Sequence, residues 1–236
     1  GSGKMGGMDS KPDVTRTNLP SRKGSIPMPD RRAFLRAGIG IALGLGGIWK
    51  TLAQSNEGGP VPPEATVFAD DGTTPNSRFA VLVYRQAFSP STPDLSEAIA
   101  ARFAANGWTG TWRYPGIFTF NHYHSTTHEV LAIYQGSGTL QLGGLKRGRP
   151  FDVASGDVIL VPAGVGHMQV KGSADFRVLG AFAGGRSWDL NRGLPGERPQ
   201  ADRHIAAVPL PDNDPLFGAD GPLVKIWKSA DTRNDS

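Results

Sequence analysis

Two histidines separated by one residue, His122 and His124, are the side chains of this sequence best placed to bind a metal ion. In an extended strand, successive side chains alternate between two faces, so residues two apart share a face and their imidazoles can converge on one ion. We therefore expect residues 117–124 to form a strand that carries both histidines on one face. The same face would carry two phenylalanines, as a dry wall beneath the ion and as tentative substrate contacts: Phe118 and Phe120.

Two further side chains complete the expected metal site. Glu129 follows His124 by five residues, at the start of the next expected strand, and His167 comes 38 residues later, just after a Pro-x-Gly turn. If the strands close into a barrel, all four side chains can point to one interior position. Three neutral imidazoles and one carboxylate suit iron, manganese, nickel, zinc, cobalt or copper rather than Ca²⁺ or Mg²⁺. An octahedral ion would keep two positions for water, substrate or O₂.

Three other polar residues near these ligands allow more than one role. His128 adjoins Glu129 and cannot share its strand face, so we expect it to support the ligands or cap a loop. It is also the candidate catalytic residue, for proton transfer or substrate contact. Gln169 has the parity of His167 and should look inward, where it would hold a substrate or merely satisfy a neighbour. His204 lies in the C-terminal part of the chain, where we expect a structural role.

The residues that must position this site are short apolar runs separated by turn residues. From residue 117 onward, clusters of glycine, proline, serine and aspartate divide the runs, which is typical of a sandwich or a small barrel. We find no internal repeat, so we expect one barrel. The expected strands are residues 117–124, 130–135, 139–142, 158–161, 167–170 and 176–182.

One strand and one helix are expected before the barrel strands. Residues 79–84 are apolar without interruption, which is typical of a strand buried on both faces. Residues 94–105 place Leu95, Ile99 and Phe103 along one side of a helix, and an Asn-Gly pair would end it.

The last part of the chain, residues 188–236, becomes rich in proline and aspartate but keeps apolar patches. We expect an irregular arm that packs on the barrel or on a partner subunit. Its expected anchors are Leu223, Ile226 and Trp227.

The first 65 residues are expected to direct export. Residues 1–29 combine a cloning remnant with a polar leader that should be disordered. In residues 30–54, the run DRRAFLR resembles a twin-arginine export signal, and the thirteen weakly apolar residues after it are too few for a transmembrane helix. Residues 55–65 form a Gly/Pro-rich linker. We therefore expect a periplasmic or otherwise exported protein, and leave open whether the signal is cleaved or stays as an anchor.

Charge and cysteine content exclude several kinds of site. The net charge is +4 at pH 7, but nine of the 25 Lys and Arg residues lie in the first 50 positions, against three acidic residues. The rest of the chain is slightly acidic and has no basic cluster interleaved with aromatic residues, so we expect no nucleic-acid partner. The chain has no cysteine, which excludes disulfides, thiolate metal sites and a cysteine nucleophile.

Two separated blocks of residues resemble the cupin superfamily. The resemblance implies an all-β double-stranded β-helix, or jelly-roll, over residues 66–187, with one short helix before it, one divalent metal ion and a homodimer. This sequence departs from the family pattern at Lys171, where asparagine is usual. That position is not a metal ligand in the family. The two blocks, which agree at nine fixed positions, are Gly116-x5-His122-x-His124-x4-Glu129-x6-Gly136 and Gly156-x5-Pro162-x-Gly164-x2-His167.

Longer stretches, at residues 122–129, 176–178, 195–199 and 208–211, resemble the YjlB-like bacterial single-domain cupins, a family that implies no settled activity. Three functional classes therefore stay open. We favour a metal-dependent enzyme, an oxygenase or an isomerase, that acts on a small molecule, because the expected ligands leave positions open on the ion. The alternatives are a protein that binds a sugar or an acid on the metal without turnover, and a barrel that the metal merely stabilises.

Overall fold

The computed structural model describes residues 62–231. The predicted leader, the twin-arginine segment and most of the linker lie outside the described residues. The described elements are β1 (Glu64–Thr66), β2 (Val81–Tyr84), α1 (Leu95–Ala105), β3 (Trp108–Tyr114), β4 (Glu129–Gln135), β5 (Ser137–Leu142), α2 (Gly144–Arg147), β6 (Arg149–Ala154), β7 (Val158–Val161), β8 (His167–Gly172), β9 (Arg177–Ala183), α3 (Gln200–Ala207) and α4 (Pro222–Asp231).

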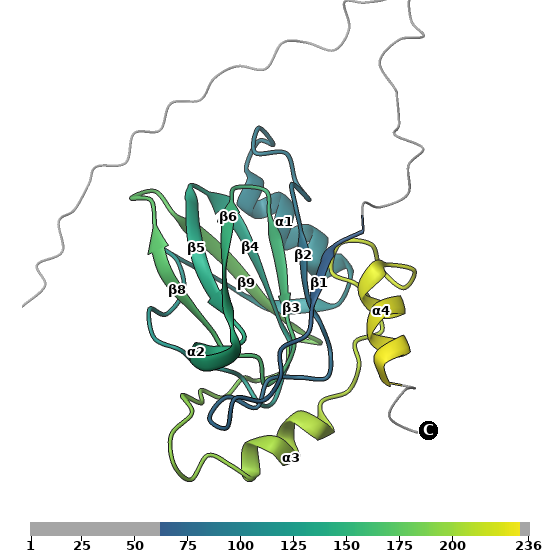
Figure 1. Ribbon diagram of the computed structural model, residues 1–236. Helices are drawn as coiled ribbons and strands as arrows, with labels where there is room; N and C mark the ends of the chain where they lie inside the picture. The colour runs from purple at the N-terminus through teal and green to yellow at the C-terminus, as the bar shows by residue number, and fades with distance from the viewer. Residues whose placement is uncertain (1–61, 232–236) are drawn as a thin grey trace, which may run out of the picture. The chain divides into compact units, whose positions relative to one another are not determined.

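Two antiparallel sheets form the body of the protein (Figure 1). The larger sheet has the strand order β1-β2-β7-β4-β9-β3, and the smaller has the order β6-β5-β8. Alternate side chains of both sheets meet in one apolar core, in which Leu131 and Ile133 of β4 pack with Leu140 and Leu142 of β5. The predicted all-β jelly-roll is therefore confirmed.

The central strands of the larger sheet, β2, β7, β4 and β9, are buried on both faces, and β4 shows why this matters for the site. Leu131 and Ile133 face the smaller sheet, whereas Val130 and Ala132 face the cluster formed with α1 and α4. Because side chains alternate along a strand, Glu129 has the parity of Leu131 and faces the space between the sheets. His128 has the opposite parity and faces the helices.

The predicted helix before the barrel is confirmed as α1, which packs on the larger sheet through three buried side chains. Leu95, Ile99 and Phe103 are each less than one tenth exposed, and Asn106 caps the C-terminal end of the helix. The predicted strand at residues 79–84 is present as the shorter β2, whose four residues are all buried. Burial of each large apolar side chain contributes about 1.5–3 kcal/mol to folding.

The prediction of a continuous strand over residues 117–124 is wrong. This segment makes only isolated bridges, His122 with His167 on one side and Tyr123 with Asn191 on the other. The His122 and His167 backbones exchange two hydrogen bonds of 3.2 and 2.8 Å, and Tyr123 and Asn191 exchange two of 2.9 and 3.0 Å. Phe118 and His124 also accept backbone hydrogen bonds of 2.9 and 2.8 Å from Gln169 and Gly164. The pairing is interrupted along the segment, which is therefore not a ladder strand.

The expected arm packs on the barrel but is not irregular throughout, because it contains two helices, α3 and α4. The apolar residues of α4 recur at helical spacing and face the barrel. Leu223 and Trp227 are buried there, and Ile226 is half-buried. The Trp227 indole donates a 2.9 Å hydrogen bond to the Ala80 carbonyl and stacks on the ring of Phe79. None of the helices within residues 62–231 has the length and apolar character that a membrane span requires.

Candidate metal centre

Three buried histidines, His122, His124 and His167, place one ring nitrogen each within 4.8 Å of the others. Their exposed fractions are 3%, 6% and 1%. The backbone bridge between His122 and His167 sets these two imidazoles side by side, with ring centroids 4.1 Å apart. Two segments distant in sequence thus bring three ring nitrogens together, where they could hold a metal ion.

The outer nitrogen of each imidazole is held by a backbone carbonyl. The Nδ1 atoms of His122, His124 and His167 lie 3.2, 2.5 and 3.0 Å from the carbonyl oxygens of Phe120, Asp189 and Val165. A carbonyl can only accept, so each Nδ1 carries the proton and donates it. In a neutral imidazole each Nε2 then presents a lone pair, which is how metal-binding histidines are oriented in proteins.

Glu129, the first residue of β4, adds a carboxylate to this group. Its Oε2 lies 3.4 Å from His124 Nε2 and 3.2 Å from His167 Nε2. Burial alone would raise the pKa of Glu129, but the charges and hydrogen bonds of the two histidines outweigh it and hold the pKa well below its usual range. The carboxylate is therefore ionised and faces imidazole nitrogens.

Three imidazole nitrogens and the Glu129 carboxylate, buried together, favour a positive charge between them. Burial and the neighbouring His167 and His124 lower the pKa of His122 to about 2, so it stays neutral. For His124, burial favours the neutral form, but Glu129 outweighs it and raises the pKa above its ordinary value. The imidazole lone pairs and the Glu129 carboxylate repel one another unless a positive charge lies between them. A proton on His124 can supply that charge, but a divalent transition-metal ion fits these nitrogen and oxygen donors better.

A tryptophan that the sequence analysis did not single out orients Glu129. The Trp112 indole on β3 donates a 3.3 Å hydrogen bond to Glu129 Oε1. Trp112 lies opposite Gly180 of β9, where a Cβ would come within 2.2 Å of the indole. Glycine at position 180 is therefore what allows the indole to lie across β9 and reach the carboxylate.

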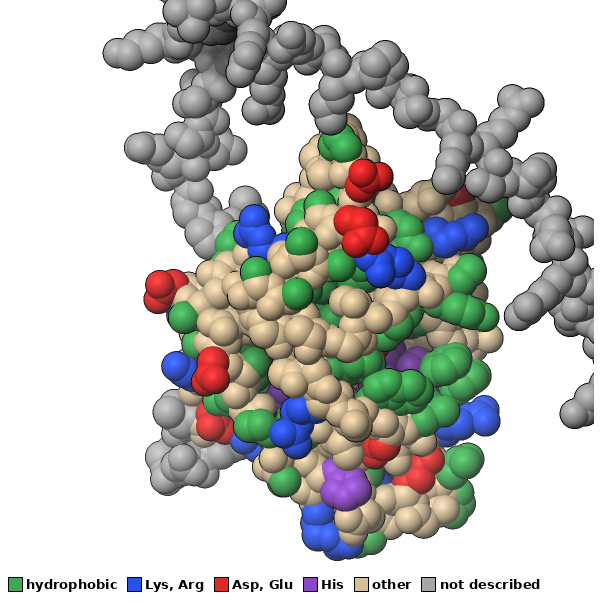
Figure 2. All heavy atoms as spheres, turned by 180° about the vertical axis from the view of Figure 1, so that it is seen from behind, with side chains coloured by type: hydrophobic (Ala, Val, Ile, Leu, Met, Phe, Trp, Pro, Cys, Tyr) green, Lys and Arg blue, Asp and Glu red, His purple; other side chains and the backbone are tan. Residues whose placement is uncertain are grey.

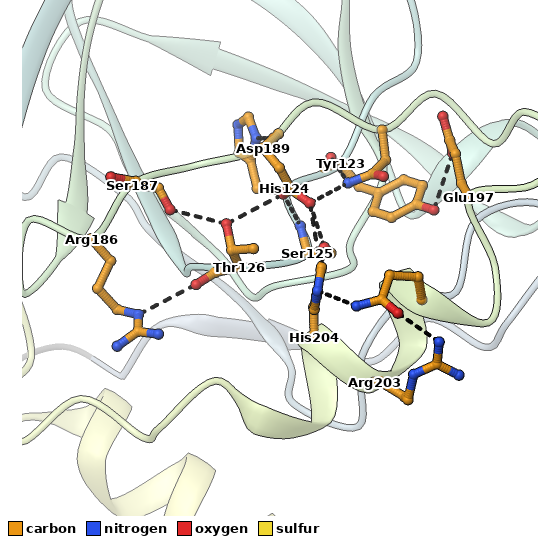
Figure 3. A network of polar contacts seen from close by, with 12 residues as sticks. Tyr123, His124, Ser125, Thr126, Arg186, Ser187, Asp189, Glu197, Arg203 and His204 are labelled. Carbon is orange, nitrogen blue, oxygen red and sulfur yellow. Dashed lines mark hydrogen bonds and ion pairs between the residues drawn. The ribbon is translucent and has the colours of Figure 1, made fainter.

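The loop after β9 supports His124 from the other side (Figure 3). The carbonyl of Asp189 accepts a hydrogen bond from His124 Nδ1–H, while the Asp189 carboxylate accepts hydrogen bonds of 2.6 and 2.5 Å from the N–H and hydroxyl of Ser125. The Ser125 hydroxyl also lies 3.1 Å from Nδ1 of His204, on α3. The loop after β9 therefore fixes the segment that carries two of the three histidines, through Asp189.

We expect Asp189→Ala to weaken metal binding by about 10- to 100-fold, because partners that orient metal ligands typically contribute this much. The alanine backbone keeps the carbonyl beneath His124 but releases Ser125, so the segment loses its anchor. A competition titration with Zn²⁺ and a chromophoric chelator measures the change. The control is Asp220→Ala, at an exposed turn before α4. Equal affinity in wild type and Asp189→Ala would show that Asp189 does not position His124.

His128, predicted as a supporting or catalytic residue, lies on the opposite face of the larger sheet. It is 1% exposed, its Nδ1 accepts a 3.0 Å hydrogen bond from the Ala163 N–H, and its ring packs on Trp227 and Phe79. Burial lowers its pKa to about 4. The alternation along β4 thus turns His128 away from the metal centre, so a role in substrate contact or proton transfer there finds no support in the geometry.

A cavity of about 450 Å³ opens beside the metal centre. Phe118 lines it but is 43% exposed, so it lies at the mouth and is not part of a dry wall beneath the ion. Phe120 stacks on Phe118, and Gln169 accepts a 3.1 Å hydrogen bond from the Ile117 N–H; neither lines the cavity. The lining residues are Gly110, Trp112, Arg113, Tyr114, Gly116, Ile117, Phe118, His122, His124, Glu129, His167, Phe182 and Trp188.

The sequence of this chain is similar to those of known proteins. Residues 109–177 match the model of the AraC-like ligand binding domain. The protein YjlB of Bacillus subtilis (strain 168), itself uncharacterised, is 41% identical over 161 residues, which cover 68% of this chain and 93% of YjlB.

Solved structures overlap with shorter parts of the chain. An 11S globulin from Wrightia tinctoria is 21% identical with a TM-score of 0.30, over 34% of this chain and 21% of the globulin. An acireductone dioxygenase from Bacillus anthracis, with a cadmium ion in its active centre, is 20% identical with a TM-score of 0.34, over 44% of this chain and 78% of the dioxygenase.

Proposed function

Because this chain belongs to the cupin family of the Bacillus subtilis protein YjlB, we propose that it holds one divalent transition-metal ion and acts on a small molecule as an oxygenase or an isomerase. The observation that carries the proposal is the orientation of the three histidines. Each Nδ1 is committed to a backbone carbonyl, which leaves three Nε2 lone pairs to converge beside an ionised carboxylate.

Different residues would bind the ion and orient its ligands. His122, His124 and His167 would hold the ion, with Glu129 as the fourth ligand. Such an ion would supply Lewis-acid or redox chemistry. Trp112 orients the Glu129 carboxylate, and the cavity lined largely by apolar side chains leaves room for a small molecule beside the ion.

A second candidate function is binding without turnover, and one observation favours it. Among the described residues that line the cavity, the titratable groups beyond the expected ligands are Arg113 and Tyr114. Neither is a good general base at neutral pH, and His128 faces the other side of the sheet. The enzyme would have to use Glu129 or an ion-bound water for proton transfer, whereas a binding protein would need neither.

Elemental analysis of the exported protein, purified without chelators or a nickel column, tests the proposal first. We expect about one equivalent of a transition metal per chain, as for a single His/Glu site. The Fe(II)-loaded protein would then be assayed for O₂ uptake, and the Zn²⁺-loaded protein for isomerisation, with mixtures of small molecules. Ligand binding without either activity would favour the binding protein. A chain that contains no metal and takes up none would overturn the metal-centre assignment.

Export is part of the proposal and rests on the run DRRAFLR at residues 30–36. The twin-arginine route carries folded proteins, so the metal would be loaded in the cytoplasm. Replacement of Arg31 and Arg32 by lysine should keep the protein in the cytoplasmic fraction; unchanged export would argue against this route. The predicted homodimer rests on the family resemblance alone, and light scattering on the purified protein would test it.

A further inference from the structure

Five aromatic rings line the cavity beside the metal centre. The volume of this cavity, about 450 Å³, is in the range that proteins use for small ligands. The rings come from β3, from the segment before His122, from β9 and from the loop after β9. They are Trp112, Tyr114, Phe118, Phe182 and Trp188.

Three of these rings are largely exposed. Tyr114 is 61% exposed, Trp188 is 48% exposed and Phe118 is 43% exposed. The space-filling view from behind shows histidine atoms in a hollow between hydrophobic side chains (Figure 2). Single exposed apolar side chains scattered over a surface are normal, whereas a group of them around a hollow is typical of a binding site.

Two of the exposed rings are held by stacked partners. Trp188 stacks on Phe182 with an interplanar angle of 21°, and Phe118 stacks on Phe120 with an angle of 20°. The guanidinium of Arg192 lies over the Phe120 ring, 4.4 Å from its centroid. Because the partners already restrict Trp188 and Phe118, little conformational entropy is lost when a ligand packs against them. An aromatic ligand gains about two- to tenfold in affinity per ring pair, beyond the burial of area.

The cation among the lining residues faces away from the cavity. Arg113 is paired with Leu179 of β9, which packs in the cluster on the helix-covered face of the larger sheet. The Arg113 guanidinium donates a 2.8 Å hydrogen bond to the Glu97 carboxylate on α1. Apart from the metal donors, the lining residues that the structure describes therefore turn no charged side chain toward the cavity. The rings, and not a charge of the wall, are left to recognise a ligand.

The wall also offers few hydrogen-bonding groups to a polar ligand. The Trp112 indole N–H is used by Glu129. Among the described lining side chains other than the metal donors, the remaining polar groups are the Tyr114 hydroxyl and the Trp188 indole N–H. A sugar carries several hydroxyls, and each hydroxyl that is buried without a partner costs free energy. The wall therefore disfavours a sugar.

We propose that this cavity takes a small molecule whose flat, apolar aromatic ring packs against Phe118 and Trp188. The inference rests on the proposed function, because the same cavity would present that molecule to the metal ion. Recognition of the ring comes from side chains of the chain itself. The inference names the substrate class of the site and makes a sugar the disfavoured ligand.

The test uses the full-length Zn²⁺-loaded protein and three uncharged alcohols. Naphthylmethanol has a flat ring system, decahydronaphthylmethanol has the same carbon skeleton with puckered rings, and glucose has many hydroxyls and no apolar ring. Each carries an alcohol group, so any contact of that group with Zn²⁺ is common to all three. In calorimetry, we expect naphthylmethanol to bind at least about fivefold more tightly than decahydronaphthylmethanol, because only the flat ring stacks. Glucose should give no measurable heat of binding.

Matched variants test which rings are responsible. Phe118→Leu and Trp188→Leu should each weaken naphthylmethanol about fivefold, with a smaller loss for decahydronaphthylmethanol, and keep one Zn²⁺. Phe217→Leu is the control, because Phe217 is 42% exposed, close to the 43% of Phe118, and lies outside the cavity. Arg113→Gln should leave the binding of all three alcohols unchanged, because the guanidinium faces α1.

Equal binding of naphthylmethanol and decahydronaphthylmethanol to protein with one bound Zn²⁺, or binding of neither, would overturn this inference and leave the metal centre intact. So would a loss of naphthylmethanol affinity in Phe217→Leu as large as that in Phe118→Leu. Failure to take up Zn²⁺ would overturn the proposed function and this inference together.

Discussion

His167→Ala, His122→Ala and His124→Ala should each lower metal affinity by more than about 100-fold, so that protein purified with sub-millimolar metal loses its stoichiometric ion. The removal of a nitrogen expected to bind the ion directly must cost more than the 10- to 100-fold loss typical of a supporting partner. Loss of the ion also removes its linked stabilisation, about 2.7 kcal/mol at a free metal concentration of 100 Kd. Elemental analysis and thermal unfolding with and without Zn²⁺ measure the two effects.

Two other histidines provide controls for this experiment. His204→Ala removes an imidazole that is 41% exposed on α3 and should keep a full equivalent of metal. His128→Ala should lower stability, since the ring is buried against Trp227, but should also keep the metal. If all three ligand variants keep one equivalent of metal, the assignment of the metal site is wrong. If His128→Ala loses as much metal as the three ligand variants do, His128 is itself a ligand.

Asp214→Ala should lower the free energy of unfolding by about 3–5 kcal/mol, because it removes one member of a buried polar network. The Asp214 carboxylate is fully buried and accepts four hydrogen bonds, of 2.5 Å from the Tyr84 hydroxyl and of 2.8 to 3.2 Å from the N–H groups of Leu216, Phe217 and Leu223. These bonds join the start of α4 to β2. Without the carboxylate, these buried donors would lack their main partner.

Urea denaturation followed by circular dichroism measures this loss, and Asp220→Ala, at an exposed position six residues later, should change stability by less than about 0.5 kcal/mol. Metal content should stay at one equivalent in both variants, since Asp214 bonds Tyr84, on the helix-covered face of the larger sheet, and the metal centre lies on the other face. A loss below about 1 kcal/mol for Asp214→Ala would show that the network does not hold the arm to the barrel.

The sequence by itself determined the fold class and the four candidate metal ligands. The spacing of His122, His124, Glu129 and His167, together with the turn residues around them, was enough to predict one barrel with one interior metal position. Strand alternation also separated His128 from Glu129. These features are local: the period of a strand and the conformational demands of glycine and proline act over a few residues, so they can be read from neighbouring positions.

The tertiary structure alone decided what holds those ligands and what surrounds them. The support of His124 comes from Asp189, 65 residues later, and the support of Glu129 comes from Trp112 because Gly180 on another strand leaves room for the indole. The segment 117–124 is bridged to two distant residues instead of forming a strand. Such contacts join positions far apart in the chain, and no local period encodes which distant residue will approach a given side chain.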